Sequence, residues 1–200
     1  MNKRKISLSL NIIIIILELI GFLLTIKENG RLGIEYYTED SNILALISSS
    51  IFVIYILFNK KIPKYLKLLK YTSTICLTVT FLVVIFILAP MYNFNYGFLL
   101  FHNELLFHHL LCPIICIISF IFFDGMQEYR IIDNILVTSV TLLYGLILII
   151  LNIKKVVDGP YPFLKVYNQP IYISIIWAIS IISFSYLIAL LLRKLNKKFA

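Results

Sequence analysis

The sequence predicts an all-α polytopic membrane protein with six transmembrane helices and both termini cytoplasmic. Hydrophobic residue types make up 60% of the 200 residues and charged types only 14%, against roughly 25% charged residues in an ordinary soluble domain. A chain of this length cannot bury so many apolar side chains in one water-surrounded core, which excludes a soluble enzyme. The same composition excludes a disordered chain.

The apolar residues gather in six runs, each close to the about 20 residues that a helix needs to cross a membrane. The six predicted spans are Ile6–Ile26, Ser41–Phe58, Tyr71–Pro90, Glu104–Phe123, Asn134–Ile153 and Ile171–Leu192. The first span follows the basic start Met1–Lys5 as in a signal peptide, but it is too long and no small-residue cleavage site follows it, so we expect a retained helix. Runs such as Ile12–Leu17 are apolar on every face, whereas the strands of a membrane barrel would alternate. Because the connections are short, the chain is predicted to form one domain over residues 1–200.

Lysine and arginine are unevenly divided between the two sides of these spans. Thirteen fall on the side of both termini and five on the other, and the excess marks the cytoplasmic side of the cell membrane. The net charge of +8 comes from these flanks rather than from a basic stripe, so no nucleic-acid partner is expected. The basic segment Lys60–Lys70 is expected to lie on anionic lipid headgroups, although its role in topology explains it equally well.

Glu18 and the pair His108 and His109 are titratable groups inside predicted spans. Such groups cost a few kcal/mol to insert, so each needs a reason. By the helical rise, Glu18 and His109 fall about 3 and 6 Å outward of the membrane centre, where a Glu–His pair would satisfy both. The alternative is a structural hydrogen bond that fixes helix packing. Adjacent residues of an α-helix point about 100° apart, so His108 and His109 are not expected to face one centre.

The fourth span carries residues for two further chemistries. A metal site from His102, His109 and Glu18 has no supporting motif such as His-Glu-x-x-His, and no metal or cofactor is predicted. Cys112 lies three residues beyond His109 and is either a nucleophile activated by that histidine or, more commonly for such a residue, a small packing side chain.

Two segments outside the apolar runs fall on the predicted outer side. In Tyr36–Asn42, Thr38 is either the N-cap of the second helix, with Glu39 and Asp40 in its positive first turn, or the source of a hydroxyl at the mouth of the bundle. The segment Gly159–Phe163 contains two prolines and two aromatic residues, which is typical of a turn at the membrane surface.

Three segments, in order and at comparable spacing, carry a resemblance. Tyr36–Asn42, Phe107–Pro113 and Tyr161–Leu164 resemble the androgen-induced-gene and androgen-dependent TFPI-regulating protein family, and its bacterial six-span relatives most of all. The resemblance implies an integral membrane threonine hydrolase that acts on fatty-acid esters of hydroxy fatty acids. It places the working threonine at Thr38 and the working histidine at His109, or less well at His108.

The resulting hypothesis is a lipid ester hydrolase whose catalytic residues are Thr38, His109 and Glu18. Tyr161 and Phe163 would contact the substrate, a membrane lipid or fatty-acid ester. Asn42 and Asn103 are the candidate oxyanion donors. The alternatives are a non-catalytic lipid-binding or structural membrane protein, and a small proton-coupled transporter, which the lack of internal repeats makes less attractive.

The hypothesis meets one geometric difficulty. With the second span starting at Ser41, Thr38 would lie about 10 Å shallower than His109, whereas proton transfer needs about 3 Å. Either the second helix starts earlier, or the fourth is shifted outward, or the two residues do not act together.

Overall fold

A computed structural model describes residues 3–125 and 129–199. In these ranges it has no β-strand, and six of its helical segments are long and apolar enough to cross a membrane: Lys3–Asn29, Tyr37–Leu57, Lys64–Met91, Asn103–Asp124, Ile131–Ile153 and Ile171–Phe199. The prediction of an all-α polytopic membrane protein is therefore confirmed. Each observed span contains most of the predicted apolar run and extends it at one or both ends.

Four of the six spans are single α-helices, and two are built from shorter pieces. The single helices are α1 (Lys3–Asn29), α2 (Tyr37–Leu57), α8 (Ile131–Ile153) and α9 (Ile171–Phe199). The third span joins α3 (Lys64–Val83), the π-helix η1 (Val84–Leu88) and α4 (Ala89–Met91). The fourth joins α6 (Asn103–Leu105), the π-helix η2 (Leu106–Leu111), α7 (Cys112–Ser119) and the π-helix η3 (Phe120–Asp124). Two short helices, α5 (Tyr96–Phe101) and η4 (Pro162–Leu164), lie in connections.

The third span begins seven residues before the predicted start at Tyr71. Pro63 is its N-cap and has an extended backbone, with φ −75° and ψ 161°. Because proline lacks the N–H that a helix interior requires and suits a helix start, the helix begins directly after it, at Lys64.

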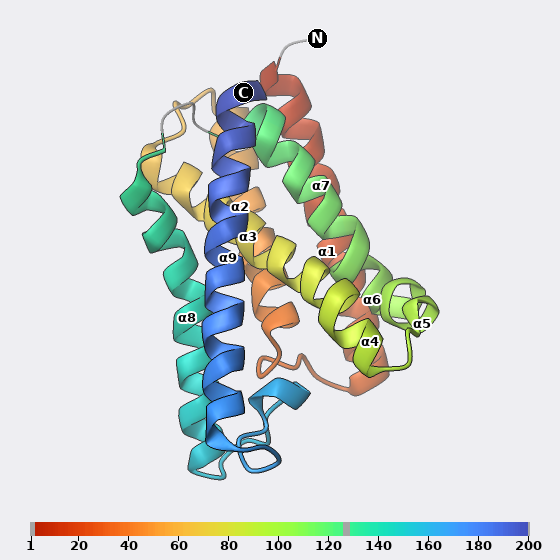
Figure 1. Cartoon of the computed structure of the whole chain (residues 1–200). Coiled ribbons are helices and arrows are strands. Elements are labelled where there is room, and N and C mark those ends of the chain that lie inside the picture. Colours follow the sequence, from red (N-terminus) through yellow and green to blue (C-terminus); the bar gives the residue numbers. More distant parts are fainter. Residues whose placement is uncertain (1–2, 126–128, 200) are drawn as a thin grey trace.

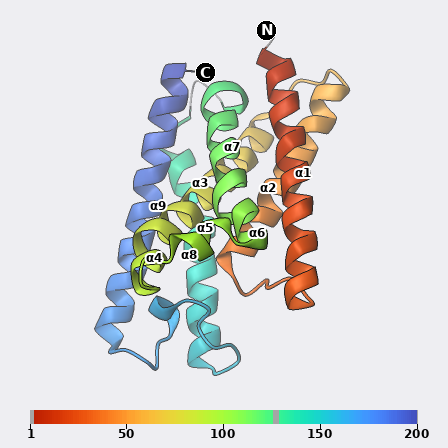
Figure 2. The same ribbon diagram turned by 90° about the vertical axis from the view of Figure 1, so that its right-hand side faces the viewer.

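The helices form a bundle in which α1 begins and α9 ends at the same end (Figure 1). The opposite end, which we call the distal end, holds residues 30–36, 92–95 and 154–170 (Figures 1 and 2). The tilted α3 crosses the bundle and packs against α2, α7, α8 and α9. Its span is accordingly the most buried of the six.

A buried ion pair lies in the bundle near the end that holds the termini. Lys70 Nζ is 3.7 Å from Asp124 Oδ2, and neither side chain is exposed. Lys70 also donates hydrogen bonds to Asn11 Oδ1 at 2.8 Å and to Ser49 Oγ at 2.9 Å. Asp124 accepts hydrogen bonds from Ser7 at 2.5 Å and from Asn11 at 2.9 Å. These partners satisfy both charges, which burial would otherwise penalise by several kcal/mol.

This ion pair corrects one expectation for the basic segment Lys60–Lys70. Lys70 lies in α3 and is fully buried, so it does not reach lipid headgroups. Its sequence position after four other lysines suggested a surface loop, but the helix that starts after Pro63 turns its side chain into the bundle. Lys60, Lys61 and Lys64 remain exposed.

Candidate active site

The first component of the site is the start of α2. This helix begins four residues before its predicted start at Ser41. The N-cap is Tyr36, which makes no side-chain capping bond. Tyr37 is buried, and its hydroxyl lies 2.7 Å from Thr141 Oγ1 of α8, which holds the first turn of α2 inside the bundle. Thr38 is therefore a residue of the first turn, and its interpretation as the N-cap is wrong. Its hydroxyl is left free for other partners, and the first turn carries Glu39 and Asp40 as expected.

The second component is the π-helix η2, which carries both His108 and His109. The i→i+5 bonding of a π-helix widens the turn, and such segments are frequent at functional sites. Both histidines are buried, at 1% and 7% relative exposure. In this geometry the two imidazoles contact two different groups of side chains.

His109 is oriented by a backbone carbonyl and faces Thr38. Its Nδ1 lies 2.7 Å from the carbonyl oxygen of Leu99 in α5. Because a carbonyl only accepts, Nδ1 carries the proton, and in a neutral imidazole Nε2 is then an acceptor. Nε2 lies 3.4 Å from Thr38 Oγ1, which is long for a hydrogen bond but within the range of unliganded catalytic pairs. The arrangement suits a general base beside a hydroxyl nucleophile.

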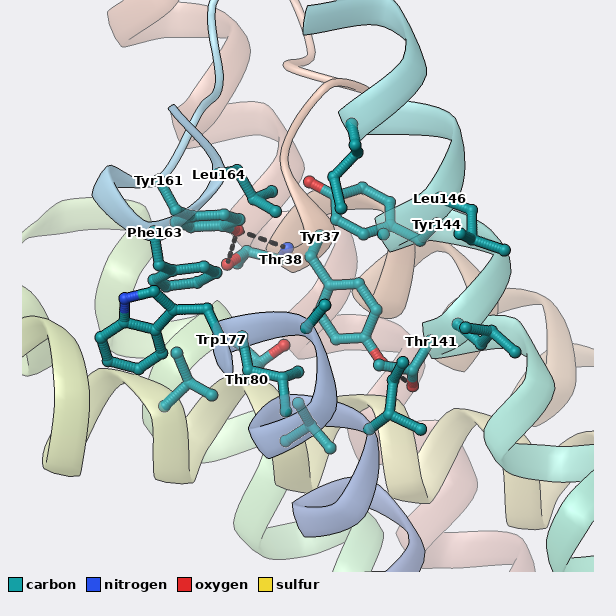
Figure 3. A pocket seen from close by; sticks show the side chains of 18 of the residues that line it. Tyr37, Thr38, Thr80, Thr141, Tyr144, Leu146, Tyr161, Phe163, Leu164 and Trp177 are labelled. Atoms are coloured by element: carbon teal, nitrogen blue, oxygen red, sulfur yellow. Dashed lines mark hydrogen bonds between the residues drawn. The ribbon is translucent and has the colours of Figure 1, made fainter. Parts of the chain in front are cut away.

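Tyr161 also lies beside Thr38 (Figure 3). Its Oη accepts a hydrogen bond from the Thr38 backbone N–H at 3.4 Å and lies 3.5 Å from Thr38 Oγ1. Its ring stacks on Phe163, with centroids 5.2 Å apart, and Phe163 in turn contacts Trp177 of α9. Burial raises the pKa of Tyr161 to about 12, so the phenol stays protonated and able to donate.

Glu18 is fully buried but lies beside His108. Its Oε2 is 3.7 Å from His108 Nε2, and Oε1 of Glu39 is 3.7 Å from His108 Nδ1 on the other side of the ring. Among the described residues, neither Glu18 oxygen nor either His108 nitrogen has a hydrogen-bond partner. The contact is close because Gly21 of α1 lies against the His108 ring, where a Cβ atom would collide with it. The structure thus brings Thr38 to His109, and places Glu18 in a separate carboxylate–histidine–carboxylate group.

Two cavities meet at Thr38. The polar cavity, of about 500 Å³, is lined by Glu39, Glu104 and both histidines among others. The apolar cavity, of about 80 Å³, lies among α2, α3, α8 and α9 (Figure 3). Residues that line both cavities are Thr38, Leu88 and Tyr161.

The remaining predicted site residues divide between the cavities and the surrounding structure. Phe163 lines the apolar cavity. Asn42 is buried and donates to the Thr38 carbonyl at 2.7 Å, so it supports the first turn of α2 rather than facing a cavity. Asn103 donates to Glu28 Oε2 at 2.6 Å, outside both cavities. Cys112 is fully buried and lines neither cavity.

Sequence reasoning included Tyr161 as a substrate contact but did not predict the contact of its hydroxyl with Thr38, and it missed the Leu99 carbonyl. A backbone carbonyl gives no sequence signal. The Tyr161 hydroxyl had a weak one, because Tyr161 falls on the same predicted side as Thr38. No family model, curated protein or solved structure matches the chain.

Proposed function

We propose that this membrane protein hydrolyses lipid esters, with Thr38 as the nucleophile and His109 as the general base. The observation that carries the proposal is the orientation of His109. The Leu99 carbonyl fixes the proton on Nδ1 and leaves the Nε2 lone pair 3.4 Å from the Thr38 hydroxyl. A buried imidazole with its free nitrogen toward a hydroxyl is the arrangement that nucleophilic acyl transfer needs.

The proposed reaction has two steps. Thr38 Oγ1 attacks the ester carbonyl carbon while its proton passes to His109 Nε2, and the tetrahedral intermediate collapses as the leaving alcohol takes that proton. A water molecule then gives a proton to His109 and its oxygen to the acyl carbon, which releases the fatty acid and returns the proton to Thr38 Oγ1. The Leu99 carbonyl takes the orienting place that a carboxylate holds in a triad.

Stabilisation of the oxyanion is assigned to the hydroxyl of Tyr161. Its Oη accepts a hydrogen bond from the Thr38 N–H and lies 3.5 Å from Thr38 Oγ1, so its own proton is available to an oxyanion that forms beside the Thr38 hydroxyl. Thr38 also lies in the first turn of α2, where the helix dipole favours negative charge. A donor placed where charge develops contributes more than one that binds the ground state.

The two cavities favour an amphiphilic ester as the substrate. The lining of the apolar cavity suits the methylene groups of an acyl chain next to the ester, and a polar part suits the polar cavity with its carboxylates and histidines. The scissile bond would then lie at Thr38, where the cavities meet. The resemblance to membrane threonine hydrolases of fatty-acid esters supports the same substrate class.

The test is hydrolysis of a long-chain fluorogenic ester, 4-methylumbelliferyl oleate, by detergent-purified protein. Thr38→Val keeps the shape and removes the hydroxyl, and His109→Gln removes the base. Each is expected to lower kcat by about 10³-fold, and Thr38→Ser to retain activity within about tenfold. Thr72→Val is the matched control, because the Thr72 hydroxyl in α3 donates to the Leu68 carbonyl and Thr72 lines neither cavity.

Turnover that survives in Thr38→Val at the wild-type rate would contradict the proposal. If the wild type binds the ester without turnover, the non-catalytic lipid-binding alternative is correct instead.

A further inference from the structure

Three potential metal ligands come together at the distal end, beside the polar cavity that Glu104 also lines. They are Glu28 in the last turn of α1, His102 at the break between α5 and α6, and Glu104 in α6. One ligand atom from each lies within 4.8 Å of the other two. This set of ligand types, one imidazole nitrogen and two carboxylate oxygens, is one that binds zinc in proteins.

Glu104 gives an independent indication of a missing partner. Glu104 is only 9% exposed, and its Oε2 has no hydrogen-bond partner in the described part of the chain. A buried carboxylate oxygen without a partner is costly. The nearby carboxylate of Glu28 adds repulsion, because two carboxylates sharing one site disfavour each other's charge. A cation between them removes both penalties.

The backbone at the break holds these groups in place. Asn103 has φ +34°, in the left-handed region, and this turn separates α5 from α6 and brings His102 and Glu104 to the same ligand group. The Asn103 side chain donates a 2.6 Å hydrogen bond to Glu28 Oε2. Metal-binding carboxylates are commonly oriented by such an outer hydrogen bond.

We propose that Glu28, His102 and Glu104 bind a divalent transition metal, with Zn²⁺ the best fit. The imidazole disfavours Mg²⁺ and Ca²⁺, which take oxygen ligands. Ligand atoms around tetrahedral zinc lie about 3.4 Å apart, so the side chains close in by about 1 Å on binding. Glu28 is exposed and His102 half-buried, which leaves both free to rotate. Three protein ligands leave a fourth position for water or an anionic group.

The metal would clamp the end of α1 to the start of the fourth span. Glu104 also lines the polar cavity that holds Thr38 and His109, so the clamp would fix one wall of that cavity. The metal site does not depend on the proposed hydrolase activity.

The test is calorimetric titration of Zn²⁺ into untagged, chelator-treated full-length protein in detergent. We expect one Zn²⁺ per chain and a rise in Tm on binding. His102→Gln, Glu28→Gln and Glu104→Gln should each weaken binding by at least about tenfold. The matched control is Glu35→Gln, because Glu35 is also at the distal end but pairs with Arg31.

Substitution of Co²⁺ for Zn²⁺ supplies a second measurement. Its signal comes from direct metal coordination, which general electrostatic attraction would not give. Co²⁺ in the site should give the visible absorption bands of a tetrahedral complex, and these should be lost in His102→Gln. His102 and Glu28 are not buried, so their variants should fold normally. The proposal is overturned by the absence of saturable Zn²⁺ binding, or by equal weakening in Glu35→Gln. Since none of these measurements uses ester hydrolysis, failure here is separate from failure of the hydrolase proposal.

Discussion

At the scale of single residues, the Thr38 hydroxyl lies between His109 Nε2 at 3.4 Å and Tyr161 Oη at 3.5 Å. In the proposed hydrolysis, His109 would take a proton and Tyr161 would donate one, as the two stages of ester attack require. Helical rise predicted that Glu18 and His109 lie at similar depth, but depth does not fix the direction in which a side chain points. Rotation of each helix about its axis decides that, and it turns Glu18 toward His108 instead.

Tyr161→Phe tests the oxyanion assignment. The substitution removes the hydroxyl and keeps the ring stacked on Phe163, so the fold should be unchanged. Loss of one oxyanion donor is expected to lower kcat by about 10²- to 10³-fold, with a smaller change in KM. Steady-state kinetics with the same fluorogenic ester measure both constants.

The matched control for this prediction is Tyr167→Phe. Tyr167 is an exposed tyrosine of the same connection whose hydroxyl bonds the Ile153 carbonyl. If Tyr161→Phe changed only KM, the hydroxyl would bind substrate without stabilising the oxyanion.

At the scale of helices, two features explain why Thr38 and His109 lie close together and not about 10 Å apart in depth, as the predicted spans had implied. The second span starts at Tyr37 rather than Ser41, and the fourth contains the π-helix η2. Hydropathy located both spans but not these features. The early start depends on a long-range contact of Tyr37 with Thr141, and a π-helix differs from an α-helix in its hydrogen bonding, which apolar periodicity does not reveal.

The approach of α1 to η2 is tested by Gly21→Ala. The added methyl group would meet the His108 ring, so α1 and η2 must separate or the ring must move. We expect the free energy of unfolding to fall by about 1–3 kcal/mol, the usual cost of overpacking a tight contact. Thermal unfolding in detergent measures the change.

Gly145→Ala is the control, since its new methyl group would meet open space within α8. There alanine should leave the Tm unchanged or raise it slightly, because it restricts the unfolded chain more than glycine does. An equal fall in Tm for both variants would show that Gly21 matters as a helix residue and not as a contact.

At the scale of the whole molecule, the six spans follow from the sequence because a bilayer requires long apolar helices whatever their neighbours. The arrangement of those helices does not follow in the same way. Lys70 illustrates the limit: its position among flanking lysines indicated a surface residue, yet Asn11, Ser49 and Asp124 hold it inside the bundle. Only the folded arrangement brings these partners together.

The orientation of the bundle is the remaining prediction at this scale, and single-cysteine labelling in intact cells tests it. Cys76, Cys112 and Cys116 are all buried, so an introduced surface cysteine should be the main one to react. With the termini cytoplasmic, Asp158→Cys at the distal end should be modified by a membrane-impermeant maleimide. Lys61→Cys, at the opposite end, should react only after the cells are permeabilised. The inverse pattern would place the Thr38 site on the cytoplasmic side, and labelling of both in intact cells would contradict an arrangement with those two loops on opposite sides of the membrane.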